Sequence, residues 1–535
     1  MASTLSLTQS ELSAVLWSTH PSVDAMIKRS LLGKRASRSL TRFMIIFGIG
    51  VAATLACFGG IVAVALTTSV YTFGQTGSAP VDPGVRGGPA GAGAPLQGLT
   101  ADETAFFQDG QARFADLEVV TKGSNNGLGP RFNSNQCLSC HSQPDAGGSS
   151  PAQNPLIAVA TLNGAKNTVP WFITQNGPIR EARFKRSANG VSDGEVHDLF
   201  VITGRTDAPG CNIVQPDFRP AGNPLTGQGG NPNIIFRIPT PLFGAGLIEA
   251  ISDSAILANM QSNASQKSAL RISGHPNAHL SGNVNRSAND GTITRFGWKA
   301  QNKSLLMFAG EAYNVEMGIT NQLFPQERDE TSGCLFNATP EDTLNFTPTP
   351  ATPGASNTAV ISDIEAFANF MRMLAPPALA TPSSENGRVT FARIGCVHCH
   401  TPSFTTGAKI ASGSSTSPSA ALSNQTANLY SDLLVHHMGE RLADGITQGG
   451  AGPDEFRTAP LWGVGQRIFF LHDGRTTNLV EAIRDHLSDG SEANEVIKRF
   501  NRLTTQEQQE LISCGRFNEE SDRIRAPAAV NSRNW

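Results

Sequence analysis

Two short segments of the sequence share one spacing of cysteine and histidine. Residues 137–141 (the first haem segment) read Cys-Leu-Ser-Cys-His, and residues 396–400 (the second haem segment) read Cys-Val-His-Cys-His. A Cys-x-x-Cys-His run attaches a c-type haem, because two thiols bond to the porphyrin and the adjacent imidazole ligates the iron. The sequence therefore predicts two covalently bound haems. The residues expected to hold them are Cys137, Cys140, His141, Cys396, Cys399 and His400.

Other chemistries of paired cysteines fit this pattern less well. A structural zinc site with four cysteine ligands needs no histidine directly after each pair, and its halves usually lie closer together. A thioredoxin-like redox pair belongs in a βαβ pattern, which surrounds neither segment. With 8 Cys and 11 His in 535 residues, chance alone would produce about 0.002 such runs. We therefore interpret the rest of the chain as the protein fold that surrounds and binds two haems.

The composition is typical of a loop-rich protein wrapped around cofactors. Glycine and proline are abundant, with 53 and 32 residues, and only 16% of residues are charged. A formal net charge of −3 does not indicate a nucleic-acid partner, and the length indicates more than one domain. Cys211 and Cys334 could form a disulfide in an oxidising compartment. The sequence does not fix the pairing among the remaining cysteines, which are Cys57, Cys211, Cys334 and Cys514.

The N-terminal region predicts a membrane anchor. Residues 43–70 carry no charged side chain, and this length is enough to span a bilayer. The tail before them, residues 1–42, ends in several lysines and arginines, which places it in the cytoplasm. We therefore expect a single-pass protein of the bacterial inner membrane whose catalytic part is in the periplasm. A cleaved signal peptide ending near residues 63–65 (Ala-Val-Ala) is the alternative.

The remainder divides into a linker and two expected haem domains. Residues 71–99 are rich in glycine, proline and alanine, which predicts a flexible linker. An N-terminal haem domain with insertions is expected over residues 100–376. A C-terminal cytochrome c-like haem domain is expected over residues 377–535, because a proline pair ends the preceding helix.

Local patterns predict helices around both haem segments. Thr100 and Glu103 have the spacing of a capping box at the start of a helix. An amphipathic helix is expected over residues 359–374, and alternating residues within 156–205 predict short strands. Ser252 or Asp253 could cap a further helix. The expected fold is mainly α, with two cytochrome c-like haem domains, inserted loops and short β-strands, preceded by one N-terminal transmembrane helix.

Eight motifs occur together in an order that resembles the bacterial di-haem oxidoreductase family, some of whose members are labelled thiol oxidoreductases. The resemblance covers roughly residues 100–515, and the family is related to the di-haem cytochrome c peroxidases. The motifs are GLGPRFNSNQCLSCHSQP, PTPLFGAGLIEAI, RFGWKAQ, EMGIT, IGCVHCHTP, YSDLLVHHMGERLADG, APLWGVG and FLHDGR.

The resemblance implies a second axial ligand for the C-terminal haem. In the peroxidases a Phe/Tyr-His-Asp-Gly segment precedes a helix whose last residue is that ligand, and the matching position here is His486. The peroxidases usually have methionine there, and a His/His haem has a lower potential than a His/Met haem. Met438 is the alternative ligand. His472, which belongs to the matching segment, could tune this haem.

The resemblance also implies a catalytic carboxylate. In the peroxidases a Trp-Asp-Gly-Arg motif and a helix lead to a Glu-Met pair, with the glutamate over the open face of the peroxidatic iron. The matching residues here are Glu316 and Met317, although the motif is altered after Trp298. Glu316 is thus the expected general acid–base group, while Met317 could instead ligate the iron and close the site.

Several histidine and tryptophan side chains have less defined expectations. His436 and His437 could form a pH-sensitive contact, contact a haem propionate, or be structural. Trp171, Trp298 and Trp462 could relay electrons between the haems or simply pack in the core.

The implied function is peroxide reduction. Hydrogen peroxide would react at the N-terminal haem, with electrons entering at the C-terminal haem from a small soluble cytochrome or copper protein. Relatives often bind a calcium ion between the haems, and the loops here allow one. The alternatives are an electron-transfer cytochrome without catalysis and an oxygenase acting on an organic substrate.

Overall fold

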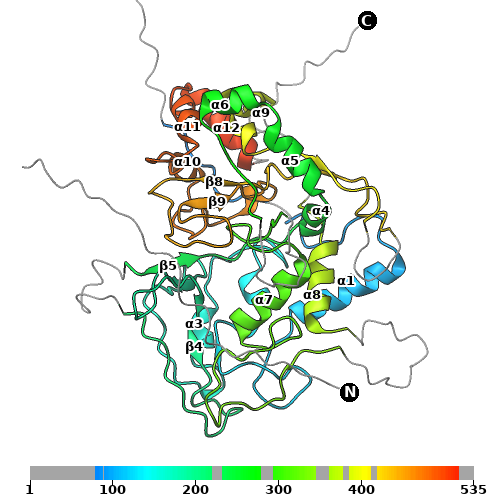
Figure 1. Cartoon of the computed structure of the whole chain (residues 1–535), viewed down its shortest axis with the longest axis vertical. Coiled ribbons are helices and arrows are strands. Elements are labelled where there is room, and N and C mark those ends of the chain that lie inside the picture. Colours follow the sequence, from blue (N-terminus) through cyan, green and yellow to red (C-terminus); the bar gives the residue numbers. More distant parts are fainter. Residues whose placement is uncertain are drawn as a thin grey trace, which may run out of the picture. The chain divides into compact units, whose positions relative to one another are not determined.

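The computed structural model describes residues 79–87, 90–219, 232–278, 293–344, 361–377, 385–410 and 418–516. All of them belong to one of two units of the chain, Gly74–Trp535, whereas the other unit, Met1–Phe73, lies outside the described residues. Figure 1 shows helices and short strands joined by long connecting segments. The predicted division into two haem domains at residues 376 and 377 stays a prediction.

Four helices of the N-terminal half pack together. Helix α8 (Asp363–Met373) contacts α1 (Ala101–Phe114), α7 (Leu305–Met317) and α4 (Ala245–Glu249), and Figure 1 shows α1, α7 and α8 side by side. The capping box predicted for α1 is confirmed, because the Thr100 hydroxyl accepts from the Glu103 backbone N–H and the Glu103 carboxylate accepts in return.

Phenylalanine side chains fill the contact between α1 and α8. The ring of Phe370 lies 5.4 Å from that of Phe107 and 5.0 Å from that of Phe114, measured between centroids. The helices approach closely because position 110 is glycine, where a Cβ would lie 2.2 Å from the Ala366 carbonyl oxygen. This aromatic core stabilises the helix that leads toward the first haem segment.

The strands are short and antiparallel. The largest sheet has three strands, with β2 (Glu181–Phe184) between β3 (Val196–His197) and β5 (Ile234–Arg237). Three two-stranded ladders pair β1 (Arg131–Phe132) with β4 (Phe200–Val201), β6 (Phe404–Thr405) with β7 (Thr426–Ala427), and β8 (Val435–His437) with β9 (Glu455–Arg457).

The remaining helices are mostly short, and α9 packs against α12. Their bounds are α2 (Cys137–Cys140), α3 (Leu156–Val159), α5 (Asp253–Gln261), α6 (Ala264–Leu270), α9 (Glu385–Ile394), α10 (Leu479–Arg484), α11 (Asn494–Asn501) and α12 (Thr505–Arg516), with 3₁₀ turns at Leu162–Gly164, Cys396–His398 and Val464–Gln466. The predicted cap of α5 is confirmed, since the Ser252 hydroxyl accepts from the Ala255 backbone N–H.

Two backbone segments cross closely just before the first haem segment. A Cβ on Gly129 would lie 2.3 Å from the carbonyl oxygen of Gly318, and one on Gly318 would lie 2.5 Å from that of Arg131. Gly318 also ends α7 with a φ of 68°, a left-handed conformation that favours glycine. The crossing therefore requires glycine on both segments.

A disulfide joins Cys211 to Cys334, with a Cα–Cα distance of 4.7 Å. The bridge spans 123 positions of the sequence. It thus realises one of the pairings that the sequence left open.

The expected mainly α fold is wrong. The described residues are only 29% helical, with 12% strand, because long irregular segments connect short elements. Within the region predicted to form strands, β2, β3 and β4 are present, but residues 156–159 form α3 instead.

The prediction of a single-pass inner-membrane protein is also corrected. Within the described ranges, no helix is long and apolar enough to cross a membrane. The longest of them, α1, has 14 residues, whereas a span needs about 20. The predicted anchor at residues 43–70 and the tail before it lie outside the described residues. The inner-membrane placement with a periplasmic catalytic part is therefore not retained.

Candidate haem sites and their acid–base groups

The first haem segment forms a single helical turn that ends in its histidine. The backbone N–H of His141 donates to the Cys137 carbonyl at 3.1 Å, which closes the turn of α2. The ring Nδ1 of His141 lies 3.0 Å from the carbonyl oxygen of Gly148. Because a carbonyl can only accept, Nδ1 carries the proton and Nε2 keeps its lone pair.

The second haem segment repeats this arrangement. It follows α9 through Gly395, which has a φ of 107°, and the backbone N–H of His400 donates to the Cys396 carbonyl at 2.8 Å. The His400 Nδ1 donates to the Tyr430 carbonyl at 2.9 Å. The same tautomer is therefore fixed at both segments.

His486 has the same hydrogen-bond pattern. It lies just after α10, and its Nδ1 donates to the Ala482 carbonyl at 2.7 Å. Burial, together with the nearby charge of His486, lowers the pKa of His400 to about 4. His486 is therefore near enough to His400 to act on its charge, and its role as the second axial ligand stays a prediction.

The donor set at both segments fits haem. Metal-binding histidines usually donate the other ring N–H to a carbonyl or carboxylate, which is what His141, His400 and His486 do. Burial also lowers the pKa of His141 to about 4, which keeps its imidazole neutral and able to ligate. Paired thiols stand beside each of the first two histidines, so the residues present would suit a covalently attached haem at each segment.

Met438, the alternative ligand, lies in a different environment. It packs with Ile238, Trp298, Phe456 and Phe469, whereas Cys396 and Cys399 pack with a separate apolar cluster. This placement favours His486 over Met438 as the partner of His400.

Glu316 lies at the C-terminal end of α7, against the loop that enters the first haem segment. The Asn133 side-chain amide donates to its carboxylate at 2.8 Å. Burial, together with the negative charge of Glu316, raises the pKa of the Cys140 thiol to about 12. The expected catalytic carboxyl therefore lies near the first haem segment, while the adjacent Met317 is buried in the main core.

Glu316 has a carboxyl partner that the sequence did not reveal. Glu181 on β2 is hydrogen-bonded to Glu316, and its other contact is Arg183, whose Nε lies 2.7 Å away. Burial and the charge of Glu181 raise the pKa of Glu316 to about 8. Burial alone would raise the pKa of Glu181 too, but the charges of Arg183 and Arg237 outweigh it and lower that pKa. Near pH 7 the pair therefore shares one proton, with the negative charge on Glu181.

A third carboxyl group, that of Glu311 on α7, lies close to this pair. Burial raises its pKa, and it accepts a hydrogen bond from the Asn302 side chain.

A sequence signal for Glu181 and Arg183 does exist, because residues two apart on a strand lie on one face. It becomes informative only once Glu316 is known to face the same strand.

A buried histidine lies beside the second haem segment. His436 is held between the carboxylates of Asp432 and Glu492, at 2.9 and 2.8 Å, and its Nδ1 lies 3.7 Å from the Cys399 sulfur. Donor atoms of Cys399, Asp432 and His436 lie within 4.8 Å of one another. A thioether at Cys399 would remove the thiolate ligand, so these contacts favour a structural role for His436.

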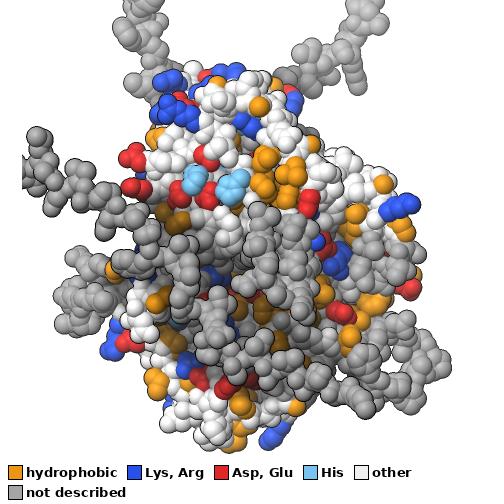
Figure 2. All heavy atoms as spheres, viewed as in Figure 1, with side chains coloured by type: hydrophobic (Ala, Val, Ile, Leu, Met, Phe, Trp, Pro, Cys, Tyr) orange, Lys and Arg blue, Asp and Glu red, His pale blue; other side chains and the backbone are white. Residues whose placement is uncertain are grey.

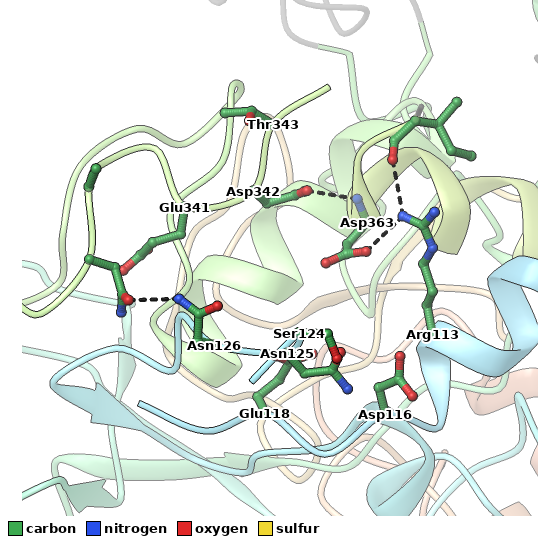
Figure 3. A pocket seen from close by; sticks show the side chains of 13 residues that line it. Arg113, Asp116, Glu118, Ser124, Asn125, Asn126, Glu341, Asp342, Thr343 and Asp363 are labelled. Atoms are coloured by element: carbon green, nitrogen blue, oxygen red, sulfur yellow. Dashed lines mark hydrogen bonds and ion pairs between the residues drawn. The ribbon is translucent and has the colours of Figure 1, made fainter. Parts of the chain in front are cut away.

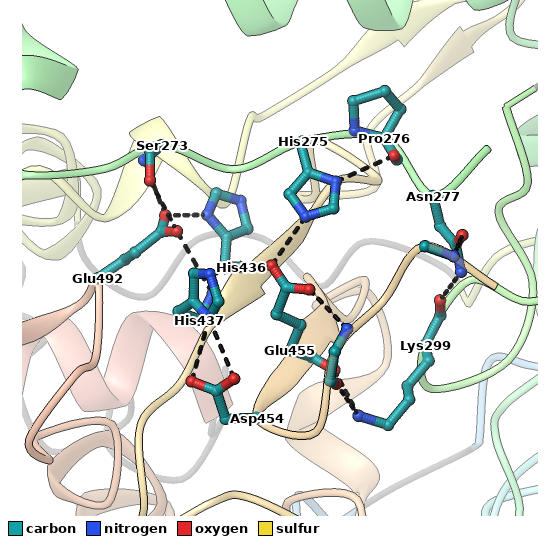
Figure 4. A network of polar contacts seen from close by, with 12 residues as sticks. Ser273, His275, Pro276, Asn277, Lys299, His436, His437, Asp454, Glu455 and Glu492 are labelled. Carbon is teal, nitrogen blue, oxygen red and sulfur yellow. Dashed lines mark hydrogen bonds and ion pairs between the residues drawn. The ribbon is translucent and has the colours of Figure 1, made fainter. Parts of the chain in front are cut away.

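The neighbouring surface carries two half-exposed histidines. His275 and His437 both contact Glu455, at 2.8 and 3.3 Å, and His437 also contacts Asp454 (Figure 4). Figure 2 shows histidine and acidic side chains together on one face of the molecule. His437 is therefore an outward-facing member of the expected histidine pair.

The aromatic candidates are spread over the molecule. Trp171 is half exposed, and Trp298 and Trp462 are buried. His472 is buried against the Phe456 ring at a centroid distance of 4.3 Å, and burial lowers its pKa to about 4. Trp298 lies 6.4 Å from His472, so these two rings share one cluster.

An acidic pocket of about 450 Å³ lies beside α1 and α8. Glu118, Asp116, Asp342 and Asp363 line it together with Arg113, and Figure 3 shows Arg113 bonded to Asp363. Burial and the charge of Asp363 raise the pKa of Glu118 to about 8. Oxygen ligands of this kind suit calcium, but the calcium expected from the resemblance stays a prediction.

Comparison with known proteins assigns the family. The model of the family described as "Di-haem oxidoreductase, putative peroxidase" matches residues 231–515. The chain belongs to this family. Haem is therefore its expected cofactor. No curated protein and no solved structure matches the chain.

The matched region of this di-haem oxidoreductase is narrower than the resemblance at residues 100–515. It contains the second haem segment, Glu316 and His486, and it starts downstream of the first haem segment and of Glu181. The roles given to all these residues stay predictions.

Proposed function

We propose that this di-haem oxidoreductase is a peroxidase, which reduces one hydrogen peroxide to two water molecules with two electrons and two protons. The pair of carboxyl groups on Glu316 and Glu181, beside the first haem segment, carries the proposal. The haems, when bound, would supply electron transfer and the iron for O–O cleavage, with electrons entering at the C-terminal one from a small soluble cytochrome or copper protein.

The protein's part is to move a proton at a fixed position. The pair holds one proton near neutral pH, so it has one oxygen that can accept the proton of peroxide and one proton to return to the leaving oxygen. Asn133 orients the Glu316 carboxyl through its amide. Arg183 keeps the charge on Glu181. His141, His400 and His486 would hold the irons through Nε2.

The test is peroxide consumption by the purified two-haem protein with a reduced small cytochrome as donor, measured against pH. The pKa of Glu316 is raised, so the shared proton is present below about 8 and is lost above it. The turnover rate should therefore fall as the pH rises through about 8. The Glu181→Gln substitution should shift the pH at which this fall occurs.

Three results would contradict the proposal. EPR signals of two low-spin haems that ignore peroxide, even in half-reduced protein, would indicate an electron carrier. Oxygen uptake with an organic substrate and without peroxide would indicate an oxygenase. A pH profile unaltered in Glu181→Gln would remove the carboxyl pair from the reaction.

A further inference from the structure

A small cavity of about 30 Å³ lies close to the first haem segment. It is lined mainly by apolar side chains, including Leu242, Trp298 and Trp462, and by two arginines, Arg457 and Arg467. One water molecule needs a cavity volume of about 10–15 Å³. The cavity is therefore large enough for a group the size of a carboxylate, but it is too small for a porphyrin.

The two arginines are charged groups in an apolar setting. Both guanidinium-bearing side chains line this cavity. Burial lowers the pKa of each to about 10, and for Arg457 the positive charge of Arg467 contributes to that value. Both remain protonated at neutral pH. A buried guanidinium such as that of Arg457 is costly unless an anion accompanies it.

Other buried arginines show how this protein usually meets that cost. Arg183, Arg205 and Arg237 each contact a carboxylate at 2.7 Å. Arg457 donates its Nε to the Gly297 carbonyl at 3.1 Å, and in the described part of the chain it has no carboxylate partner. The cavity is therefore short of negative charge at Arg457.

The cavity borders the environment of His141. Thr240 lines the cavity, and its backbone lies near enough to the His141 imidazole to influence its pKa. The Gln143 side chain, two residues after His141, donates to the carbonyl of Gln466 at 3.0 Å, next to Arg467. The arginines thus come from the C-terminal half of the chain and line a cavity next to the environment of His141.

We propose that Arg457 and Arg467 bind the propionate carboxylates of the haem attached at Cys137 and Cys140. A haem c keeps both propionates after attachment, and guanidinium groups bind carboxylates with two parallel hydrogen bonds. This inference rests on the haem placement within the proposed function. It adds that the C-terminal half completes the binding site of the N-terminal haem.

The consequence for that haem is electrostatic. Positive charge near an iron disfavours the ferric state, so loss of either arginine should lower the midpoint potential of the N-terminal haem. The propionates would also lose their partners and titrate nearer neutral pH, which would make the potential pH-dependent. The C-terminal haem should keep its potential.

The test compares Arg457→Gln and Arg467→Gln with their Lys variants and with Arg502→Gln, an exposed control. Both haem potentials are measured by spectroelectrochemistry at several pH values, and haem attachment is counted by mass. The Gln variants should lower only the N-terminal potential, with a smaller shift for Lys and none for the control. Unchanged potentials in both Gln variants with two haems attached, or a shift confined to the C-terminal haem, would overturn the inference.

Two further measurements distinguish a failure of the haem placement from a failure of the proposed propionate contacts. A wild-type chain without two attached haems would refute the haem placement itself. If the Gln variants do not fold, resonance Raman spectra of the wild-type protein decide instead: propionate bands should show hydrogen bonding that persists through neutral pH, and bands of water-exposed propionates would overturn the inference.

Discussion

Asn133 holds Glu316 by two separate contacts. Its side-chain amide donates to the Glu316 carboxylate at 2.8 Å, and its backbone N–H donates to the Glu316 carbonyl at 2.7 Å. The last turn of α7 is thereby fixed to the loop that enters the first haem segment, so the carboxyl has little freedom to turn away.

Glu316→Gln keeps the size of this side chain and removes its acid–base function. We expect peroxide reduction to fall by about 10²–10⁴-fold, the usual contribution of a positioned general acid–base group. Steady-state turnover and haem content should be measured together, with the exposed Glu440→Gln as the matched control. Full activity in Glu316→Gln would assign the proton transfer to another group.

His486→Met should raise the potential of the C-terminal haem. Methionine replaces an imidazole as axial ligand, and His/Met haems have higher potentials than His/His haems. Spectroelectrochemistry should show the shift together with an absorption band typical of iron–methionine ligation. Met438→Leu is the matched control, and a potential that moved with Met438→Leu instead would exchange the two assignments.

Glu118 should make folding stability depend on pH. Its pKa is raised to about 8 in the folded protein by burial and by the charge of Asp363, from a usual value of 4.5. The folded state therefore holds a proton that the unfolded state releases, so the free energy of unfolding should fall between about pH 5 and 8, by up to about 1.4 kcal/mol per pH unit. Glu118→Gln keeps an acceptor for the Tyr313 hydroxyl, 3.1 Å away, and should flatten the slope.

Chemical denaturation at several pH values measures this slope. Because many groups contribute to it, the informative quantity is the difference between the wild type and Glu118→Gln, with Glu440→Gln as the exposed control. An identical slope in all three would show that Glu118 does not hold the proton.

Removing the Cys211–Cys334 bridge should destabilise the chain. A native disulfide that closes a long loop typically contributes about 2–4 kcal/mol. A Cys211→Ala/Cys334→Ala double variant leaves both haem segments intact, so denaturant unfolding followed by haem absorbance measures the loss. Unfolding at the wild-type midpoint would mean that the bridge adds no stability.

The sequence was most informative where spacing alone dictates chemistry. The two haem segments and the capping box at Thr100 follow from local rules, and the Thr100 cap is confirmed. The family is likewise confirmed by its match over residues 231–515.

Features that depend on distant contacts could not be predicted. Glu181 lies 135 positions before Glu316, and nothing local indicates that β2 brings them together. Residues 156–159 have an apolar pattern that fits a strand, yet they follow Pro155 into a helical turn. The mainly α expectation failed for a related reason, since strands of two to four residues joined by loops carry almost no periodic signal.

The crossing of Gly129 and Gly318 has a consequence for mutational tolerance. Every single-base change in a glycine codon that encodes another amino acid adds a side chain, and neither position has room for a Cβ. In a saturation library selected only for folded protein, both codons should keep glycine alone. Sequencing the survivors would therefore test the close crossing beside the first haem segment without any measurement of haem or activity.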